Sequence, residues 1–240
     1  MRYFADLHIH SVLSPCADFL MTVENILKKL KENNIKIFSI TDHNSCGNSR
    51  IFKEKAEKEG LLFIPGIEIQ TAEEIHIAAY FKTMEELEKT AEEVLNSLPP
   101  IENNEEIYGY QLILDKEDEY CDKETKFLAG ASSMSIDEIY KLIKKNNGLF
   151  IPAHIDRSNS LISNIGYLPE FEYDGLEIYS ESKIKNIVEK YKIKYPVFSS
   201  SDAHFVEQIS KAKMSFEMDE LNIEEFFNSV KKQKIYLEVK

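Results

Sequence analysis

The chain has 240 residues, 43% of them hydrophobic, and this length and apolar content predict one sizeable core and a single domain over residues 1–240. Its formal net charge of -13 leaves no broad positive surface, which disfavours binding to nucleic acid or another polyanion over a wide area. Three widely spaced cysteines, and no apolar stretch of the length of a secretory signal or a membrane span, predict a reduced, cytoplasmic protein without a membrane partner.

Strand-like and helix-like patterns alternate along the first hundred residues. In chain order they predict a strand at 3–9, an amphipathic helix at 22–33 with Thr22 as its N-cap, a buried strand at 35–41, a helix near 48–59, strands at 61–69 and 75–81, and a charged helix at 84–97. This β–α rhythm is typical of a parallel sheet.

The rhythm is interrupted after Pro99 and Pro100 by an acidic, irregular stretch. We interpret residues 99–134 as an insertion, and a lid over the functional site is one role for it. A helix then runs from Ser135 to Gly148. The remaining patterns predict strands at 148–154, 174–180, 195–204, 211–218 and 234–239, and helices near 182–192 and 222–232. Seven or eight short strands alternating with helices favour an α/β barrel of parallel strands, with an open sheet as the alternative.

All six histidines lie in short segments whose composition is typical of metal-ligand sites. His8 and His10 are two residues apart on a predicted strand, so their side chains emerge on one face with Cα atoms about 7 Å apart. One metal ion can bridge that span. The others are His43 in TDHNS, His76 in EEIHIAAY, His154 in PAHIDR and His204 in SSDAH.

Two carboxylates accompany the histidines: Glu68 near the end of the run FIPGIEI, and Asp202 two residues before His204. Because the loops at the carboxyl ends of parallel barrel strands converge on one mouth, we expect these groups to meet there. Nitrogen and oxygen donors without a majority of cysteines suit zinc, manganese or iron, and they argue against a closed structural zinc site.

Each residue also has a simpler interpretation. A single histidine at a strand end is more often a structural or surface residue, but six of them in comparable places favour a shared site. Glu68 alone fits a solvated loop acid, Asp18 a turn before the first helix, and Arg157 a surface ion pair. Cys16 and Cys46 are typical of small buried side chains.

The segments DLHIHS, TDHNS, PAH and SSDAH occur in this order, with GIEI and His76 between the second and the third. In these motifs the chain resembles the PHP (polymerase and histidinol phosphatase) family, in its stand-alone phosphoesterase subgroup, from Asp6 to about His204. The resemblance implies a distorted TIM-like (β/α)7 barrel, up to three metal ions in a cleft at the strand ends, and hydrolysis of phosphoesters.

The resemblance also implies how the ligands divide among the metal ions. One ion is shared by His8, His10 and Asp202, a second by His76, His154 and Glu68, and the remaining one by His43 and His204, while Glu68 bridges the first two. Many relatives place an Asp or His five or six residues after the second histidine of the first motif, where this chain has Pro15 and Cys16. Asp18 is the first candidate for the replacing ligand and Cys16 is the second.

Two or three divalent ions about 4 Å apart can hold a bridging hydroxide of lowered pKa and can bind the oxygens of a phosphate. Arg157, three residues after His154, is a candidate clamp for a phosphate oxygen. We therefore predict a hydrolase of a small phosphorylated metabolite, such as a nucleotide, a nucleoside bisphosphate or histidinol phosphate, with Arg157, His10 and Asp202 as catalytic residues. The alternatives are a nuclease for short single strands and a non-catalytic, metal-binding regulatory module.

Overall fold

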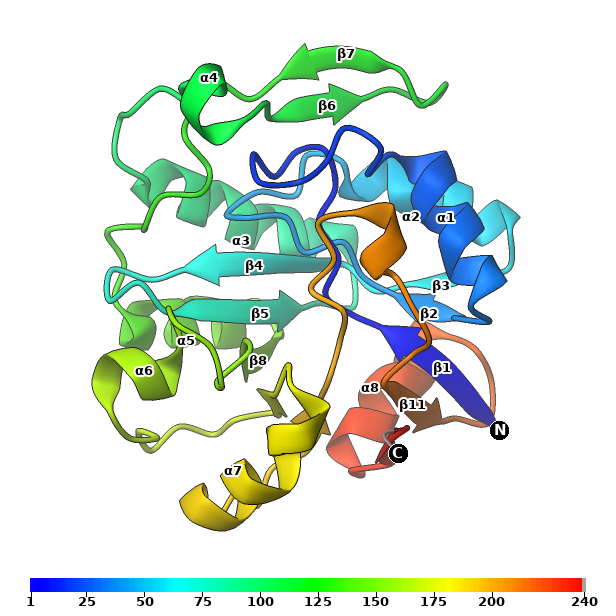
Figure 1. The fold of residues 1–240 in the computed structure, drawn as a ribbon, viewed down its shortest axis with the longest axis vertical. Helices are drawn as coiled ribbons and strands as arrows, with labels where there is room; N and C mark the ends of the chain where they lie inside the picture. Colours follow the sequence, from blue (N-terminus) through cyan, green and yellow to red (C-terminus); the bar gives the residue numbers. More distant parts are fainter. Residues whose placement is uncertain (239–240) are drawn as a thin grey trace.

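The computed structural model describes residues 1–238, and helices surround its central strands (Figure 1). The strands are β1 (Arg2–Asp6), β2 (Ile37–Phe38), β3 (Leu62–Phe63), β4 (Gly66–Gln70), β5 (His76–Tyr80), β6 (Leu112–Leu114), β7 (Tyr120–Lys123), β8 (Leu149–Pro152), β9 (Leu176–Glu177), β10 (Val197–Phe198), β11 (Met214–Glu217) and β12 (Ile235–Leu237). The helices are α1 (Val23–Glu32), α2 (Ser49–Lys58), α3 (Met84–Ser97), α4 (Glu105–Tyr108), α5 (Ile136–Lys145), α6 (Leu161–Ile165), α7 (Ile184–Tyr191) and α8 (Ile223–Lys231), with short 3₁₀ turns at Glu181–Lys183 and Val206–Gln208.

Most predicted elements form at or near their predicted positions, although several strands are shorter than expected. The strand predicted at 61–69 is instead two strands, β3 and β4, which lie in different sheets. α3 and α5 begin with complete capping boxes, in which Thr83 pairs with Glu86 and Ser135 with Glu138. The predicted final strand extended to Val239, which lies outside the described residues. Among residues 1–238, no helix combines the length and the apolar character that a membrane crossing needs.

The strands form several small sheets. β1, β2 and β3 pair in parallel, and β11 and β12 extend this sheet on the other side of β1 in antiparallel orientation. β4, β5 and β8 form a second sheet, in which both pairings are antiparallel, and β9 and β10 form a parallel pair.

The prediction of uniformly parallel strands is therefore wrong, and within residues 1–238 the sheets do not close into a barrel. The reason lies in the connection between β4 and β5. Only residues 71–75 separate the two strands, whereas a parallel crossover needs a dozen residues or more. The chain must therefore turn back on itself after Gln70, which places His76 opposite Gln70 across the pair.

The insertion at 99–134 contains α4 and the hairpin β6–β7, which lies over the loops that follow β1 and β2 (Figure 1). The Asn48 side chain makes two hydrogen bonds to the backbone of β6. It donates to the Leu112 carbonyl at 3.1 Å and accepts from the Leu114 N–H at 3.0 Å. Asp118 in the hairpin turn accepts from the first N–H groups of α1, those of Val23 and Glu24, at 2.8 and 2.9 Å.

This contact also corrects one prediction about α1. Thr22 occupies the N-cap position, but its side chain makes no capping hydrogen bond. The carboxylate of Asp118, ninety-five residues further along the chain than Val23, satisfies those N–H groups instead. The insertion is thus fastened to the first helix as well as to the loops below it.

Candidate metal centre

The structure brings all six histidines together with Glu68 and Asp202. His8 and His10 follow β1, His43 follows β2, Glu68 is the middle residue of β4, His76 begins β5, His154 follows β8, and Asp202 and His204 follow β10. Isolated bridges between Ile9 and Ala203 and between His43 and Glu68 hold these segments side by side. The imidazoles form a continuous cluster in which neighbouring ring centroids lie 4.2–5.8 Å apart.

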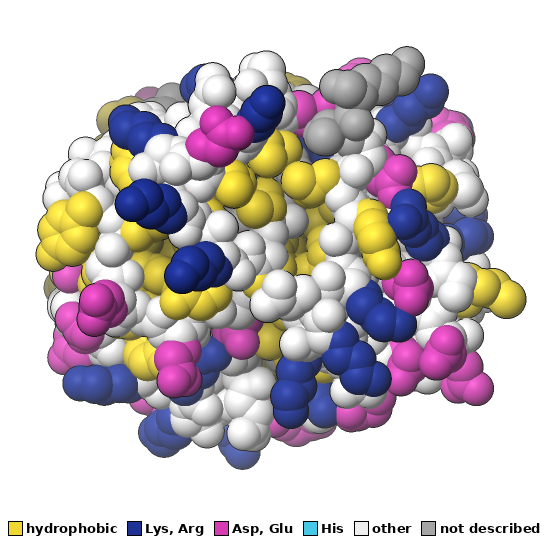
Figure 2. All heavy atoms as spheres, turned by 90° about the horizontal axis from the view of Figure 1, so that it is seen from below, with side chains coloured by type: hydrophobic (Ala, Val, Ile, Leu, Met, Phe, Trp, Pro, Cys, Tyr) yellow, Lys and Arg dark blue, Asp and Glu magenta, His cyan; other side chains and the backbone are white. Residues whose placement is uncertain are grey.

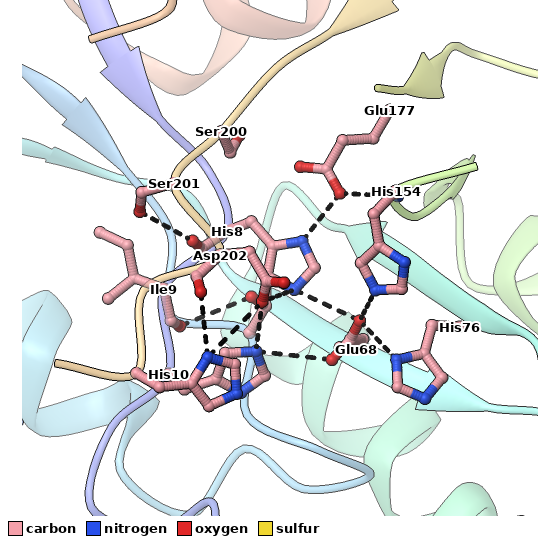
Figure 3. A network of polar contacts seen from close by, with 12 residues as sticks. His8, Ile9, His10, Glu68, His76, His154, Glu177, Ser200, Ser201 and Asp202 are labelled. Carbon is pink, nitrogen blue, oxygen red and sulfur yellow. Dashed lines mark hydrogen bonds and ion pairs between the residues drawn. The ribbon is translucent and has the colours of Figure 1, made fainter. Parts of the chain in front are cut away.

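Glu68 lies at the centre of the cluster and is only 1% exposed (Figure 3). Its Oε1 is 2.9 Å from His76 Nδ1, 3.1 Å from His154 Nε2 and 3.3 Å from His8 Nε2. Its Oε2 is 3.0 Å from His43 Nδ1 and 3.5 Å from His10 Nε2. One carboxylate therefore faces five imidazoles.

Asp202 forms a second centre beside Glu68. Its Oδ1 lies 3.3 Å from His10 Nε2 and 3.4 Å from His8 Nε2, so the two histidines stand between the two carboxylates. His204 Nδ1 is more distant from this oxygen, at 3.8 Å, and is 3.0 Å from the Asp202 carbonyl.

The donors fit divalent cations. Within the described residues, several buried side-chain atoms of the cluster have no hydrogen-bond partner: His8 Nε2, His10 Nε2, His43 Nδ1, His154 Nδ1 and Glu68 Oε2. Leaving a buried polar atom unpaired is costly, and an ion in contact with these atoms would remove that cost. Three groups have all their donor atoms within 4.8 Å of one another: His8, His10 and Glu68; His43, Glu68 and His76; and His10, His43 and His204.

Residues that were not among the predicted site residues orient the imidazoles of His8 and His10. Glu177 Oε2 lies 2.9 Å from His8 Nδ1, so a proton on this nitrogen leaves the lone pair of Nε2 facing Glu68 and Asp202. Glu177 also accepts from the His154 backbone N–H at 3.1 Å.

Ser14 does the same for His10. The Ser14 hydroxyl donates to Asp42 at 2.7 Å, so it must accept from His10 Nδ1, which lies 3.0 Å away. Asp42 is held in turn by the backbone N–H and hydroxyl of Ser11 at 2.7 and 2.6 Å. Sequence reasoning missed Glu177 and these supporting roles. The available signals were an acid within the apolar run LEI and the serines next to the first motif, Ser11 and Ser14.

The electrostatic environment of the cluster favours the ionised forms of the Glu68 and Asp202 carboxylates. Burial alone would raise the pKa of Glu68, but His76, His8 and His43 outweigh it and hold that pKa well below its usual range. The pKa of Asp202 is likewise lowered, against the effect of burial, by His8 and His10. Burial and the neighbouring His204 and His43 lower the pKa of His10, which keeps this imidazole neutral and its lone pair available.

The structure separates the two candidates for the replacing ligand. The Asp18 carboxylate accepts from the Leu20 N–H at 2.8 Å within its own turn, and among residues 1–238 no hydrogen bond or ion pair joins this carboxylate to a site histidine. The Cys16 thiol instead lies against His43 and His204. Of the two candidates, the structure therefore places the Cys16 thiol closer to the site histidines than the Asp18 carboxylate.

Arg157 reaches the cluster from its open side. Its guanidinium pairs with Asp202 Oδ2 and stacks on the Tyr179 ring with the Cζ atom 3.5 Å from the ring centroid. His8, His10 and Glu68 are almost fully buried, whereas the side chains of His76, His204 and Arg157 are 15%, 22% and 39% exposed. A ligand from solvent would therefore enter beside these three residues.

Two of the predicted ligands have an unusual backbone. His154 and Asp202 have φ values of 29° and 50°, in the left-handed region that side chains other than glycine and asparagine rarely adopt. In both cases the chain turns sharply at the end of a strand, and this turn directs the side chain back toward Glu68 or His10.

The comparisons with known proteins agree with this architecture. The family model of the PHP domain matches residues 6–240, and no curated protein matches the sequence. The lesion-specific endonuclease PfuEndoQ from Pyrococcus furiosus has a similar structure, with a TM-score of 0.67 and 19% identity over 97% of this chain and 56% of that one. A two-domain protein from Bacteroides vulgatus that contains a predicted PHP-like metal-dependent phosphoesterase has a TM-score of 0.55 and 16% identity, over 99% of this chain and 65% of its own.

A third similar structure is an amidohydrolase from Chromobacterium violaceum with bound sulfate, with a TM-score of 0.58 and 14% identity over 97% of both chains. The present chain spans a little over half of the endonuclease chain and about two thirds of the Bacteroides protein. At these identities the likeness shows a common fold.

Proposed function

The chain belongs to the PHP domain family, and from this premise we propose that it is a metal-dependent phosphoesterase that hydrolyses a small phosphorylated metabolite. The observation that carries the proposal is Glu68, a buried carboxylate that faces five imidazoles, three of which present to it a nitrogen without a hydrogen-bond partner. Such a donor set suits two or three ions of zinc, manganese or iron.

In this proposal His8, His10 and Asp202 hold one ion, Glu68 bridges to a second, and His76 and His154 complete the second position. His43 Nδ1 also faces Glu68, at 3.0 Å from its Oε2. Bound divalent ions would supply positive charge for the phosphate oxygens and would lower the pKa of a bound water toward neutral pH.

The remaining chemistry depends on the protein's own side chains. Glu177 and Ser14 keep a proton on Nδ1 of His8 and His10, so both imidazoles offer Nε2 to the site without reorientation. Arg157 stands at the exposed edge, where its planar guanidinium can exchange Asp202 for a phosphate oxygen of the substrate.

The charge of the protein limits which class of substrate it can bind. The net charge of -13 opposes a long polyanion, and on the face opposite the hairpin, basic and acidic side chains are interspersed rather than separated (Figure 2). We therefore favour a nucleotide, a nucleoside bisphosphate or a histidinol-phosphate-like compound over nucleic acid.

The test is phosphate release from a panel of nucleotides, bisphosphates, sugar phosphates and histidinol phosphate by protein reconstituted with manganese. Activity should be lost in His10→Ala, because this change removes a ligand nitrogen from the centre, and should be kept in Cys121→Ser, whose cysteine is exposed on β7. Equal release by His10→Ala would exclude the proposed site, and cleavage of labelled oligonucleotides alone would exclude the small-molecule substrate.

A further inference from the structure

The group formed by His10, His43 and His204 lies at the outer edge of the centre. Their donor atoms are within 4.8 Å of one another, and the His10 ring stacks on His204 with centroids 4.2 Å apart. His10 Nε2 and His43 Nδ1 are buried atoms without a hydrogen-bond partner. This group contains no carboxylate, in contrast to the two groups that include Glu68, so an anionic donor beside it would add to the binding of a cation.

The loop at 14–18 is fastened to two of these histidine segments. The Ser14 hydroxyl accepts from the His43 backbone N–H at 3.2 Å, and the Asp18 backbone N–H donates to the His204 carbonyl at 2.8 Å. Cys16 stands midway between these two anchors, and its thiol lies against both imidazoles. The position of this side chain is therefore set by the same backbone contacts that set His43 and His204.

We propose that Cys16 is a metal ligand, which joins His43 and His204 in a thiolate-containing position at the edge of the centre. The inference rests on the proposed function only in that the centre holds divalent ions. Three protein donors with one open position are typical of zinc sites that accept water or a substrate.

A thiolate changes which metal this position prefers. Soft sulfur donors favour zinc, whereas the positions built on Glu68 offer the harder oxygen donor that manganese also accepts. The chain would then carry two kinds of metal position within one cluster. Manganese alone would fill the inner positions, and zinc or cobalt would be needed to fill the outer one.

Cobalt(II) is the probe, because a bond between cobalt and a thiolate gives a charge-transfer absorption in the near ultraviolet that nitrogen and oxygen ligands do not give. Apoprotein titrated with cobalt should develop this band. The band should disappear in Cys16→Ser and Cys16→Ala, together with about one cobalt ion per chain. It should persist in Asp18→Asn, which keeps the turn contact with Leu20, and in Cys121→Ser.

Two results would overturn the proposal: wild-type protein that binds cobalt without the band, or a band of full intensity in Cys16→Ala. Circular dichroism of each apoprotein separates loss of the ligand from loss of the fold. If the band depends on Cys16 while every phosphoester is left intact, the ligand assignment stands and the proposed hydrolysis fails, so the two failures are distinguishable.

Discussion

Glu68 and Asp202 are buried acids that face imidazoles, with Arg157 as a further partner of Asp202, and each depends on neighbours that hold those imidazoles in one orientation. His8 is the clearest case, because Glu177 binds one nitrogen and the site uses the other. The six histidines and two acids that meet here were recognisable from their motifs. Glu177 was not, because an acid in a strand shows its partner only when the strand is placed in space.

Glu177→Gln is expected to weaken metal binding by roughly 10- to 100-fold, since the amide holds the Nδ1 proton of His8 less strongly than a carboxylate does. Isothermal titration of the apoprotein with zinc measures this directly. Glu181→Gln is the matched control, because Glu181 begins the 3₁₀ turn that follows β9 and, within the part of the chain that the structure describes, forms no ion pair or hydrogen bond with a histidine side chain. Equal affinities of Glu177→Gln and wild type would show that this contact does not position His8.

Arg157→Lys tests the phosphate clamp. Lysine keeps the positive charge but loses the planar pair of donors, so we expect KM for the phosphoester to rise about tenfold, while kcat changes less. Steady-state kinetics with the best substrate of the panel provide the measurement. Lys213→Ala removes the other cation over the Tyr179 ring and should leave KM unchanged; a rise of equal size there would assign the effect to Tyr179.

At the scale of elements, the periodic patterns predicted helices well because each buries one stripe of apolar residues, as α5 does with Ile136, Ile139, Leu142 and Ile143. Strand direction was predicted poorly. Alternation of strands and helices suggested parallel pairing throughout, but the short link after Gln70 forces an antiparallel pair. Long-range caps such as Asp118 on α1 are equally invisible, because they join segments that are distant in sequence.

The insertion is expected to be a rigid cover that depends on one close approach. Gly109 has a φ of 94°, and a Cβ atom there would come within 2.1 Å of the Pro15 carbonyl oxygen. Gly109→Ala should therefore lower the free energy of unfolding by about 1–3 kcal/mol and loosen α4 from the loop that carries Cys16.

Gly166→Ala is the matched control, since Gly166 has a φ of 87° with no atom within 4 Å of the added carbon. It should show the cost of a positive φ at alanine without a steric contact, at a ψ of -8° where Gly109 has 177°. Chemical denaturation and hydrogen exchange of residues 105–123 compare the two variants. Equal losses, with unchanged exchange in the hairpin, would show that the contact with Pro15 does not hold the insertion in place.

At the scale of the whole molecule, composition predicted an acidic surface, and the motifs predicted that six histidines from distant segments meet. What the sequence could not provide was the division of the strands among separate sheets. That division depends on which edges pair, and isolated bridges such as the one between His43 and Glu68 join sheets that no local pattern connects.

Because ions held by the centre bind the folded chain and not the unfolded one, chelation should destabilise the entire protein. An ion at a hundred times its Kd contributes about 2.7 kcal/mol, which corresponds to a fall in Tm of roughly 5–10 °C on removal. Differential scanning calorimetry with and without EDTA measures the difference. The Tm of His10→Ala should fall less on addition of the chelator. A wild-type Tm that is unchanged by EDTA and by added zinc would argue against any bound ion.

The left-handed backbone at His154 and Asp202 has a consequence for how such a protein evolves in the laboratory. Each residue holds a conformation that costs on the order of 1–3 kcal/mol, and glycine would relieve most of it. A library selected only for survival of heat in the presence of a chelator, with no demand for turnover, is therefore expected to collect glycine or asparagine at 154 and 202 early. Such a selection would yield proteins that are more stable to heat but have lost their catalytic activity.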